Sequence, residues 1–319
     1  MRQAGRYLKQ YREIRARHGI LEICKNPELA ATVTIQPVEI LDVDAAIVFA
    51  DILLPLEPMG LKVQFVSGEG PLIANPIREA SDIDALSSDH TAELGYVGET
   101  IRLVARALAG KVPMIGFVGA PFTLASYMCE GGPSKTFLRT KNLMLSDEIL
   151  WRRLMGKLVD VLGQYAALQV AAGARAIQVF DSWVGALSPE DYVRYVQSYS
   201  RALIERIRDL NVPVIHFGTG ASGFLRELHT AGGDVVSVDW RINIDQAWTE
   251  IGHRSAIQGN LDPAALFAPL PELRKKVYDL LRRTGSRPGH IVNLGHGILP
   301  ETPVDHVKAT VQMVREFQR

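Results

Sequence analysis

The chain has 319 residues, 47% of them hydrophobic, and its 35 basic residues balance its 35 acidic ones. This length allows two domains or one large α/β barrel. No apolar run is long enough to cross a membrane, and no basic stripe extends beyond the N-terminus, so the sequence argues against both a membrane protein and a nucleic-acid binder. The only cysteines, Cys24 and Cys129, are too few for a disulfide scaffold or a thiolate zinc site, and they indicate a reducing compartment.

Positive charge is concentrated in the first seventeen residues, which contain a single acid, Glu13, and the basic residues Arg2, Arg6, Lys9, Arg12, Arg15 and Arg17. In a neutral protein, such a local excess usually faces an anion. Because Gly5 permits backbone angles that other residues avoid, Arg2 and Arg6 could direct two guanidinium groups at one carboxylate or phosphate. A solvated helix or a nonspecific basic arm explains the charge equally well.

Helices and apolar runs of strand length alternate along the rest of the chain. One helix is expected over residues 27–41, after the capping residue Asn26, and another over residues 148–172, capped by the stretch Ser146-Asp-Glu148 and closed by Gly173. A further helix is expected over residues 188–210. Residues 52–60 are expected to form a loop over the surface. The predicted strands begin at Ala45, Val63, Val112, Ala176, Val214, Val235, Ala256 and Ile291.

Eight apolar strands that alternate with helices are typical of a parallel sheet covered by helices. We therefore predict an α/β fold, a single (β/α)8 TIM barrel domain over residues 1–319. An open, doubly wound sheet is the alternative. No Gly-x-Gly-x-x-Gly motif follows the first strand, which weakens a dinucleotide-binding interpretation.

In such a barrel the active site lies at the carboxyl ends of the strands. Asp51 has only apolar neighbours there, and a carboxylate in such company is costly unless it is paired. A histidine in the position of His216 is more often a satisfied strand residue than a ligand, and Asp262, before Pro263, is interpreted as a helix cap. Ser182 has no His–Asp partners that the sequence can place, so a nucleophilic role is disfavoured. Two aromatic residues beside them, Phe180 and Trp183, could belong to the core or line a pocket. The polar residues that follow the predicted strands are Asp51, Asp181, Ser182, His216, Asp239, Asn260, Asp262 and His296.

Five segments, in this order and spacing, resemble the uroporphyrinogen decarboxylase family, and the resemblance covers essentially the whole chain. It implies a cytoplasmic homodimer built as one (β/α)8 barrel, working without metal or organic cofactor. It also implies a reaction in haem biosynthesis, the decarboxylation of the four acetate side chains of uroporphyrinogen III to give coproporphyrinogen III. The segments are Met1-Arg-Gln-Ala-Gly-Arg-Tyr-Leu8, Phe49–Leu53, Gly119–Tyr127, Phe180–Trp183 and Asn293–Ile298.

The same resemblance implies roles for individual residues. Asp51 resembles the acceptor for the pyrrole N–H groups at the centre of the substrate, and Asp51 and Arg2 are the catalytic candidates. The residues implied to bind the carboxylates are Arg2, Gln3, Ala4, Gly5, Arg6 and Arg15, and those implied to surround the rest of the substrate are Tyr127, Phe180, Ser182 and His296.

Two alternatives stay open. Corrinoid- and thiol-linked methyltransferases share this barrel and bind zinc through a His-x-Cys pair and a distant cysteine. Here the corresponding stretch reads His216-Phe217-Gly218, without a cysteine, which disfavours that reading. The second alternative is a tetrapyrrole-binding protein without catalysis.

The N-terminal signature departs from the family in two ways. Lys9 stands where the family has proline, which removes no functional group. Met1 is the signature's own methionine, so the basic substrate-binding segment, residues 1–17, is expected to lack residues upstream.

Overall fold

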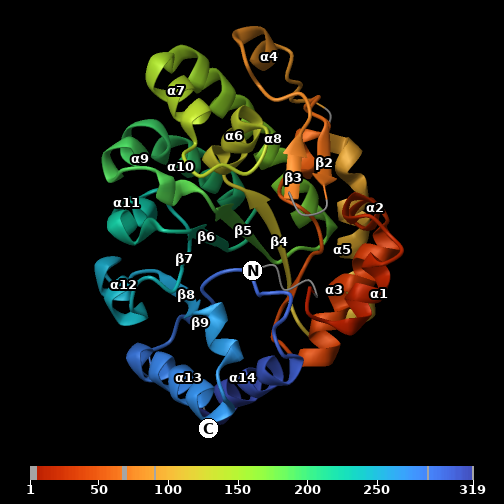
Figure 1. The fold of residues 1–319 in the computed structure, drawn as a ribbon, viewed down its shortest axis with the longest axis vertical. Coiled ribbons are helices and arrows are strands. Elements are labelled where there is room, and N and C mark those ends of the chain that lie inside the picture. Colours follow the sequence, from red (N-terminus) through yellow and green to blue (C-terminus); the bar gives the residue numbers. More distant parts are fainter. Residues whose placement is uncertain (1–5, 67–69, 90, 286, 318–319) are drawn as a thin grey trace.

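The computed structural model describes residues 6–66, 70–89, 91–285 and 287–317. Its central feature is a curled parallel sheet of seven strands in the order β1-β4-β5-β6-β7-β8-β9, with helices outside it (Figure 1). Each strand pairs in parallel with the next; Phe180 of β5, for example, lies opposite Phe217 of β6. The strands are β1 (Ala46–Ile47), β4 (Met114–Gly119), β5 (Ala176–Asp181), β6 (Val214–Gly218), β7 (Val235–Val238), β8 (Ala256–Leu261) and β9 (His290–Leu294).

The predicted helix caps are confirmed where the sequence signals were strongest. The side chain of Asn26 accepts hydrogen bonds from the backbone N–H groups of Glu28 and Leu29, and Asp147 caps the long helix that Gly173 ends. The helices are α1 (Lys9–Arg15), α2 (Ile20–Lys25), α3 (Pro27–Leu41), α4 (Ala80–Asp84), α5 (Gly95–Leu108), α6 (Pro121–Glu130), α7 (Leu138–Ser146), α8 (Glu148–Ala172), α9 (Pro189–Tyr195), α10 (Gln197–Arg208), α11 (Leu225–Thr230), α12 (Ile244–Glu250), α13 (Leu270–Thr284) and α14 (Val304–Phe317).

Five short 3-10 helices complete the described elements. Three of them begin two or three residues after the end of a sheet strand, so the chain turns tightly at the carboxyl ends of β5, β6 and β8. They are η1 (Leu54–Leu56), η2 (Thr91–Leu94), η3 (Val184–Ala186), η4 (Ala221–Phe224) and η5 (Pro263–Phe267).

The core lies between the sheet and the helices around it. All five residues of β6 are buried, as expected for a strand covered on both sides. From α8, Trp151 and Tyr165 are almost completely buried. Burying a large apolar side chain contributes about 1.5–3 kcal/mol, so α8 is a principal stabilising element of the fold.

The predicted strand at Val63 is real, but its placement in the barrel is wrong. It is β2 (Val63–Val66), which pairs antiparallel with β3 (Gly70–Ile73), a strand that the sequence analysis missed. Within β2, Val63 is buried and Gln64 exposed, the alternation of a strand with one solvated face. The parallel sheet of the described residues therefore has seven strands.

Residues 52–60 do not form a surface loop. Leu53, Leu54 and Leu56 are completely buried, and Met59 almost so, because η1 turns this apolar stretch against α8 and η2. Pro55 stands in the first turn of η1, where a missing N–H group costs nothing. The segment that follows Asp51 is thus part of the core.

Candidate functional site

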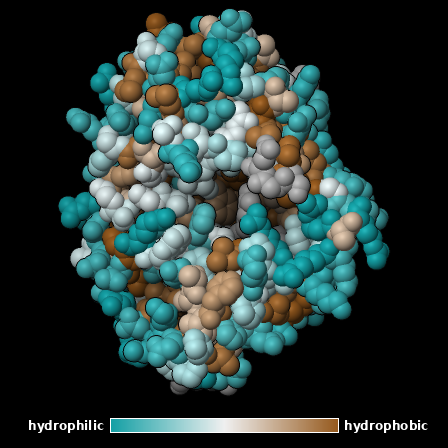
Figure 2. Space-filling model, in the orientation of Figure 1, coloured by the Kyte–Doolittle hydropathy of each residue, from teal (hydrophilic) through white to brown (hydrophobic). Residues whose placement is uncertain are grey.

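Figure 2 shows a hollow near the centre of the face seen in Figure 1, where the strands of the curled sheet surround the middle of the molecule. Hydrophobic residues lie inside this hollow and more hydrophilic ones around it. An apolar recess with a polar rim is the usual form of a small-molecule site.

Aromatic rings form a continuous chain across neighbouring strands. Phe117 of β4 contacts Phe180 of β5 edge-on at 5.6 Å between ring centroids, and Phe180 contacts Phe217 of β6 at 6.0 Å. Phe217 stacks on His296 at 6.4 Å, and His296 lies 6.2 Å from the ring of Trp240. The structure therefore joins two predicted site residues, Phe180 and His296, through Phe217.

Asp51 follows β1 and is only 5% exposed. Its Oδ1 accepts a hydrogen bond from the backbone N–H of Leu53 at 3.0 Å, which orients the carboxylate. The next residue, Ile52, packs so closely on Gly119 that a Cβ added to that glycine would lie 3.2 Å from it. Asp51 is therefore held at the carboxyl end of β4 as well as of β1.

Tyr127 lies where α6 packs on the segment after β5, which carries Ser182. The ring of Tyr127, almost buried, lies 3.8 Å from that of Trp183, and Phe137 lies against the same tryptophan at 4.9 Å. Ser182, directly before Trp183, is half-buried. The segment that carries Ser182 thus lies against α6 through the contact between Trp183 and Tyr127.

Asp181, at the end of β5, is completely buried. Its Oδ1 accepts a hydrogen bond from the Thr123 hydroxyl at 2.7 Å, while Oδ2 has no hydrogen-bond partner among the described residues. Burial raises the pKa of the carboxyl to about 7, although the bond from Thr123 lowers it. Asp181 is therefore an acid that titrates near neutral pH.

We expect Asp181→Asn to become more stable relative to the wild type as pH rises. The pKa of Asp181 is about 7 in the folded protein and 3.8 as its ordinary value, so between these values the folded state holds a proton that the unfolded state has lost. Folding stability of the wild type thus falls by about 1.4 kcal/mol per pH unit over this window, then levels off. Urea unfolding of both proteins at pH 5, 6, 7 and 8 measures the difference in their folding stability. This difference should change with pH, because asparagine does not titrate.

The comparison of the two proteins is necessary because His216 changes folding stability with pH in the opposite direction to Asp181. It is completely buried in β6, and burial lowers its pKa from 6.5 to about 4, so its contribution to stability is lost as pH falls through that range. The His216 contribution is common to both proteins and cancels in the difference between them. A difference that stays constant from pH 5 to 7 would contradict the assignment to Asp181.

The N-terminal segment is tied to the segment that carries His296. The guanidinium of Arg12 donates from Nε to the carbonyl of Arg6 at 3.2 Å and from Nη2 to the carbonyl of Pro300 at 2.6 Å. Arg12, which the sequence analysis did not select, therefore bridges two predicted parts of the site. Arg6 itself is exposed. The predicted residues Arg2, Gln3, Ala4 and Gly5 lie outside the described residues.

Arg15 is exposed on α1, and its Nη1 donates to the carbonyl of His18 at 2.5 Å. Burial, followed by the charge of Asp51, raises the pKa of the Cys24 thiol, and Arg15 lowers it. Asp51 and Arg15 are therefore both within electrostatic reach of Cys24.

Two polar residues at the strand ends have structural partners. Asp239 accepts hydrogen bonds from the backbone of Gly220 at 2.7 Å and of Arg241 at 2.9 Å, and pairs with the Arg241 guanidinium at 2.5 Å. The amide of Asn260 donates to the carbonyls of Asp239 and Ile242. Both residues fasten the loop after β7. Asp262 accepts a bond from the N–H of Ala264 at 2.9 Å, which confirms its interpretation as a cap.

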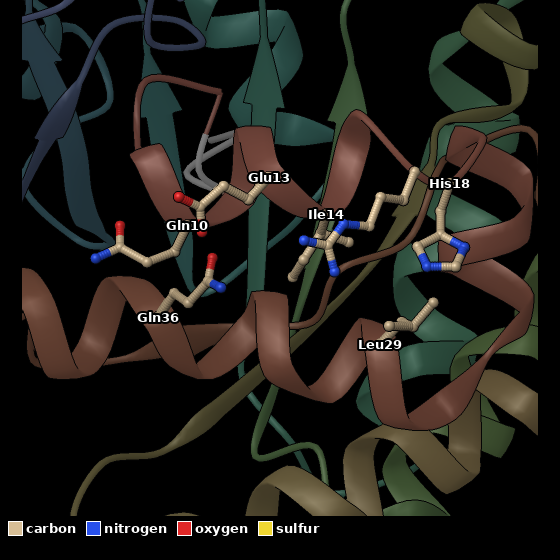
Figure 3. Close-up of a pocket in the computed structure, with 7 residues that line it drawn as sticks. Gln10, Glu13, Ile14, His18, Leu29 and Gln36 are labelled. Carbon is tan, nitrogen blue, oxygen red and sulfur yellow. The ribbon is translucent and has the colours of Figure 1, made fainter.

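A separate pocket of about 310 Å³ lies between α1 and α3 (Figure 3). It contains none of the predicted site residues. Its lining combines polar and charged side chains with two aliphatic ones, Ile14 and Leu29, and the polar members are Gln10, Glu13, Arg17, His18 and Gln36. We therefore place the candidate site at the strand ends rather than here.

Sequence reasoning did not select Thr123, Phe217 or Arg12, and it left Trp183 open between the core and a pocket wall. Thr123 was within reach, since it lies inside a segment that carries the family resemblance. Phe217 and Arg12 gave no signal, because an aromatic residue in a strand and an arginine on a basic helix are ordinary.

Two further structural facts bear on function. No helix of the described chain is long and apolar enough to cross a membrane, and no three His, Cys, Asp or Glu side chains among the described residues are grouped to hold a metal ion.

Comparison with solved structures agrees on the fold. A methyltransferase from Methanosarcina mazei matches with a TM-score of 0.80 and 20% identity, over 93% of this chain and 88% of its own. A B12-independent methionine synthase from Shewanella sp. W3-18-1 matches with a TM-score of 0.60 and 10% identity, over 94% and 90%. At such identities the likeness shows a shared fold alone.

Comparison by sequence reaches further. The family model described as uroporphyrinogen decarboxylase matches residues 1–317. A curated uroporphyrinogen decarboxylase of Solibacter usitatus is 74% identical over 100% of this chain and 92% of its own length. Those of Carboxydothermus hydrogenoformans and Koribacter versatilis are 52% and 51% identical, each over 99% of this chain and 91% of its own length. The chain therefore belongs to the uroporphyrinogen decarboxylase family.

Proposed function

We propose that this protein removes carbon dioxide from the four acetate side chains of uroporphyrinogen III and so forms coproporphyrinogen III in haem biosynthesis. The observation that carries the proposal is the match of residues 1–317 to the family, with a curated uroporphyrinogen decarboxylase 74% identical over the whole chain. The apolar hollow in Figure 2 suits a macrocycle with an anionic edge.

The reaction needs an electron sink. When an acetate on a pyrrole ring loses carbon dioxide directly, the electron pair of the broken C–C bond has nowhere to go. Protonation of the adjacent ring carbon makes the pyrrole a cation that accepts this pair. A proton is then added to the exocyclic carbon to give the methyl group, and the ring carbon loses its proton. Each of the four decarboxylations thus consumes one proton overall and releases one molecule of carbon dioxide.

Asp51 is proposed to stabilise this cation. An ionised carboxylate is an acceptor only, so it can receive the pyrrole N–H groups at the centre of the substrate. Its burial and the bond from Leu53 N–H preorganise it, and a fixed charge in a site that excludes water is often the largest catalytic contribution. Asp51 would therefore act through its charge.

The arginines are proposed to hold the carboxylates. Arg2 would orient the carboxylate that is lost, with Arg6, Arg15, Gln3 and the Ala4–Gly5 backbone around the remaining ones. An arginine has a pKa above about 12, which makes it a poor proton donor and a good fork for carboxylates. Tyr127, Phe180, Ser182 and His296 would line the rest of the substrate.

The remaining predictions are proposed with the function: closure of the sheet into a TIM barrel, one domain, a homodimer, a cytoplasmic location and a reaction without cofactor. The two cysteines are free and buried, which suits a reducing compartment. No metal or nucleic acid enters the mechanism.

The test is anaerobic incubation of the purified protein with uroporphyrinogen III, followed by oxidation and chromatography of the porphyrins. We expect intermediates with seven, six and five carboxyl groups and then the tetracarboxylic product. Unchanged octacarboxylate with measurable binding would instead support a tetrapyrrole-binding protein. Stoichiometric zinc in the same preparation, without decarboxylation, would support a methyltransferase.

A further inference from the structure

Outside the proposed set of substrate contacts, a buried group of polar atoms joins the end of β5 to the start of α6. It consists of Asp181 at the end of β5, Thr123 in the first turn of α6 and the backbone N–H of Trp183. Asp181 and Thr123 are both completely buried. Hydrogen bonds that water cannot reach are stronger than exposed ones, and their loss costs more.

Asp181 does not face the substrate. Successive side chains of a strand point to opposite faces. Phe180 belongs to the aromatic chain that runs through Phe117 and Phe217, so it lies on the inner face of the sheet. Asp181 therefore points to the other face, toward α6, where its Oδ1 accepts the bond from Thr123. A carboxyl in this place acts through other residues.

Thr123 uses its hydroxyl twice. It donates to Asp181 Oδ1 at 2.7 Å and accepts from the N–H of Trp183 at 3.2 Å. The hydroxyl has one proton, and its donation to Asp181 leaves the oxygen lone pairs directed at Trp183. Asp181 thus sets the direction in which Thr123 holds the segment after β5.

The second contact between the same two segments lies one helical turn further along α6. Tyr127 is four residues after Thr123 and so lies on the same face of the helix, with its ring 3.8 Å from that of Trp183. Ser182 stands between Asp181 and Trp183, both of which are held by Thr123. The two proposed substrate contacts, Tyr127 and Ser182, are therefore fixed by the same link.

We propose that Asp181 and Thr123 are positioning residues, which lock the segment after β5 onto α6 and so fix Tyr127 and Ser182 for substrate binding. The part that concerns substrate rests on the proposed function. The part that concerns the link itself does not.

Thr123→Val tests the link, because valine keeps the shape of threonine and removes the hydroxyl. Thr123→Ser keeps the hydroxyl and is the rescue variant. Thr100→Val is the matched control: Thr100 is also completely buried in a helix, but its hydroxyl bonds the carbonyl of Tyr96 within α5. Hydrogen exchange of the Trp183 amide, followed by mass spectrometry of peptides, reads the link directly. We expect exchange about tenfold faster in Thr123→Val and unchanged in the other two.

Steady-state kinetics of decarboxylation measure the effect of the link on substrate binding. We expect KM to rise about tenfold in Thr123→Val with kcat nearly unchanged, since loss of uniform binding acts on KM. Thr123→Ser and Thr100→Val should keep the wild-type KM. Equal KM values in the valine and serine variants, or a rise of the same size in Thr100→Val, would overturn the positioning role.

If Thr123→Val does not fold, Asp181→Leu tests the link from the other partner, since leucine has similar size and removes the acceptor. The same faster exchange and higher KM are expected, and wild-type values for both would refute the proposal. A wild-type protein that does not decarboxylate would refute the proposed function, while the exchange measurement would still decide whether the link exists.

Discussion

Asp51→Asn should reduce kcat for decarboxylation about 10²–10³-fold, while the protein folds normally. Asparagine has the size of aspartate, and its side-chain oxygen can still accept the bond from Leu53 N–H that Asp51 accepts at 3.0 Å. The substitution therefore removes the charge and little else. Removal of one preorganised electrostatic contribution costs about 2.7–4 kcal/mol in the transition state. Single-turnover rates with uroporphyrinogen under anaerobic conditions measure the effect on the chemical step.

Asp262→Asn is the matched control for this experiment. Asp262 also follows a strand and also accepts a bond from the N–H two residues later, at 2.9 Å from Ala264. Its interpretation is a helix cap, and asparagine caps as well as aspartate does. We expect its turnover to stay near that of the wild type. If Asp51→Asn retained the same turnover as Asp262→Asn, the charge of Asp51 would have no part in catalysis.

Gly295→Ala should destabilise the protein and impair the site together. A Cβ on Gly295 would lie 2.5 Å from the backbone nitrogen of Trp240 and 3.1 Å from the carbonyl carbon of Asp239. Backbone atoms cannot rotate away, so the ends of β7 and β9 must separate. Overpacking of this kind costs about 1–3 kcal/mol of folding stability. His296 follows Gly295 directly, and its ring lies 6.2 Å from that of Trp240. We therefore expect kcat/KM to fall by about tenfold or more.

Gly156→Ala is the matched control, in which the same substitution is made where there is free space and is expected to stabilise the protein. Gly156 lies within α8, and a Cβ there would meet nothing within 4 Å. Alanine is favoured over glycine in a helix by about 0.5–1 kcal/mol, so this variant should be more stable than the wild type with unchanged kinetics. Thermal unfolding and steady-state assays on both variants decide the matter. A Gly295→Ala protein with wild-type stability and KM would show that the two strand ends do not need this close approach.

Much of the secondary structure was readable from local signals. Asn26 and Asp147 predicted the starts of two helices, because their side chains accept hydrogen bonds from the N–H groups that the first turn leaves unpaired. Continuous apolar runs marked the strands of the parallel sheet, since both faces of such strands are covered. By contrast, α7 and β3 were missed, and the predicted helix over residues 188–210 is divided at Val196 into α9 and α10.

Errors of placement have one physical origin. An apolar run states that a segment will be buried, but it does not name the partner that buries it. For this reason Val63 was assigned to the barrel although β2 pairs with β3, and Leu53–Leu56 were assigned to a surface loop although they are core. In each case the answer depended on contacts with residues distant in the chain.

For the site, the sequence by itself determined the kinds of residue and their motifs: a basic N-terminal segment, Asp51 after the first strand, and the segments around Tyr127, Ser182 and His296. Tertiary structure alone decided how they meet. The pairing of β5 with β6 joins Phe180 to Phe217, the packing of α6 on β5 brings Thr123 to Asp181, and Arg12 reaches the carbonyl of Pro300. The reason is physical: hydrogen bonds and ring contacts act over a few ångströms, and which groups come that close is set by strand register and helix packing, which no local pattern specifies.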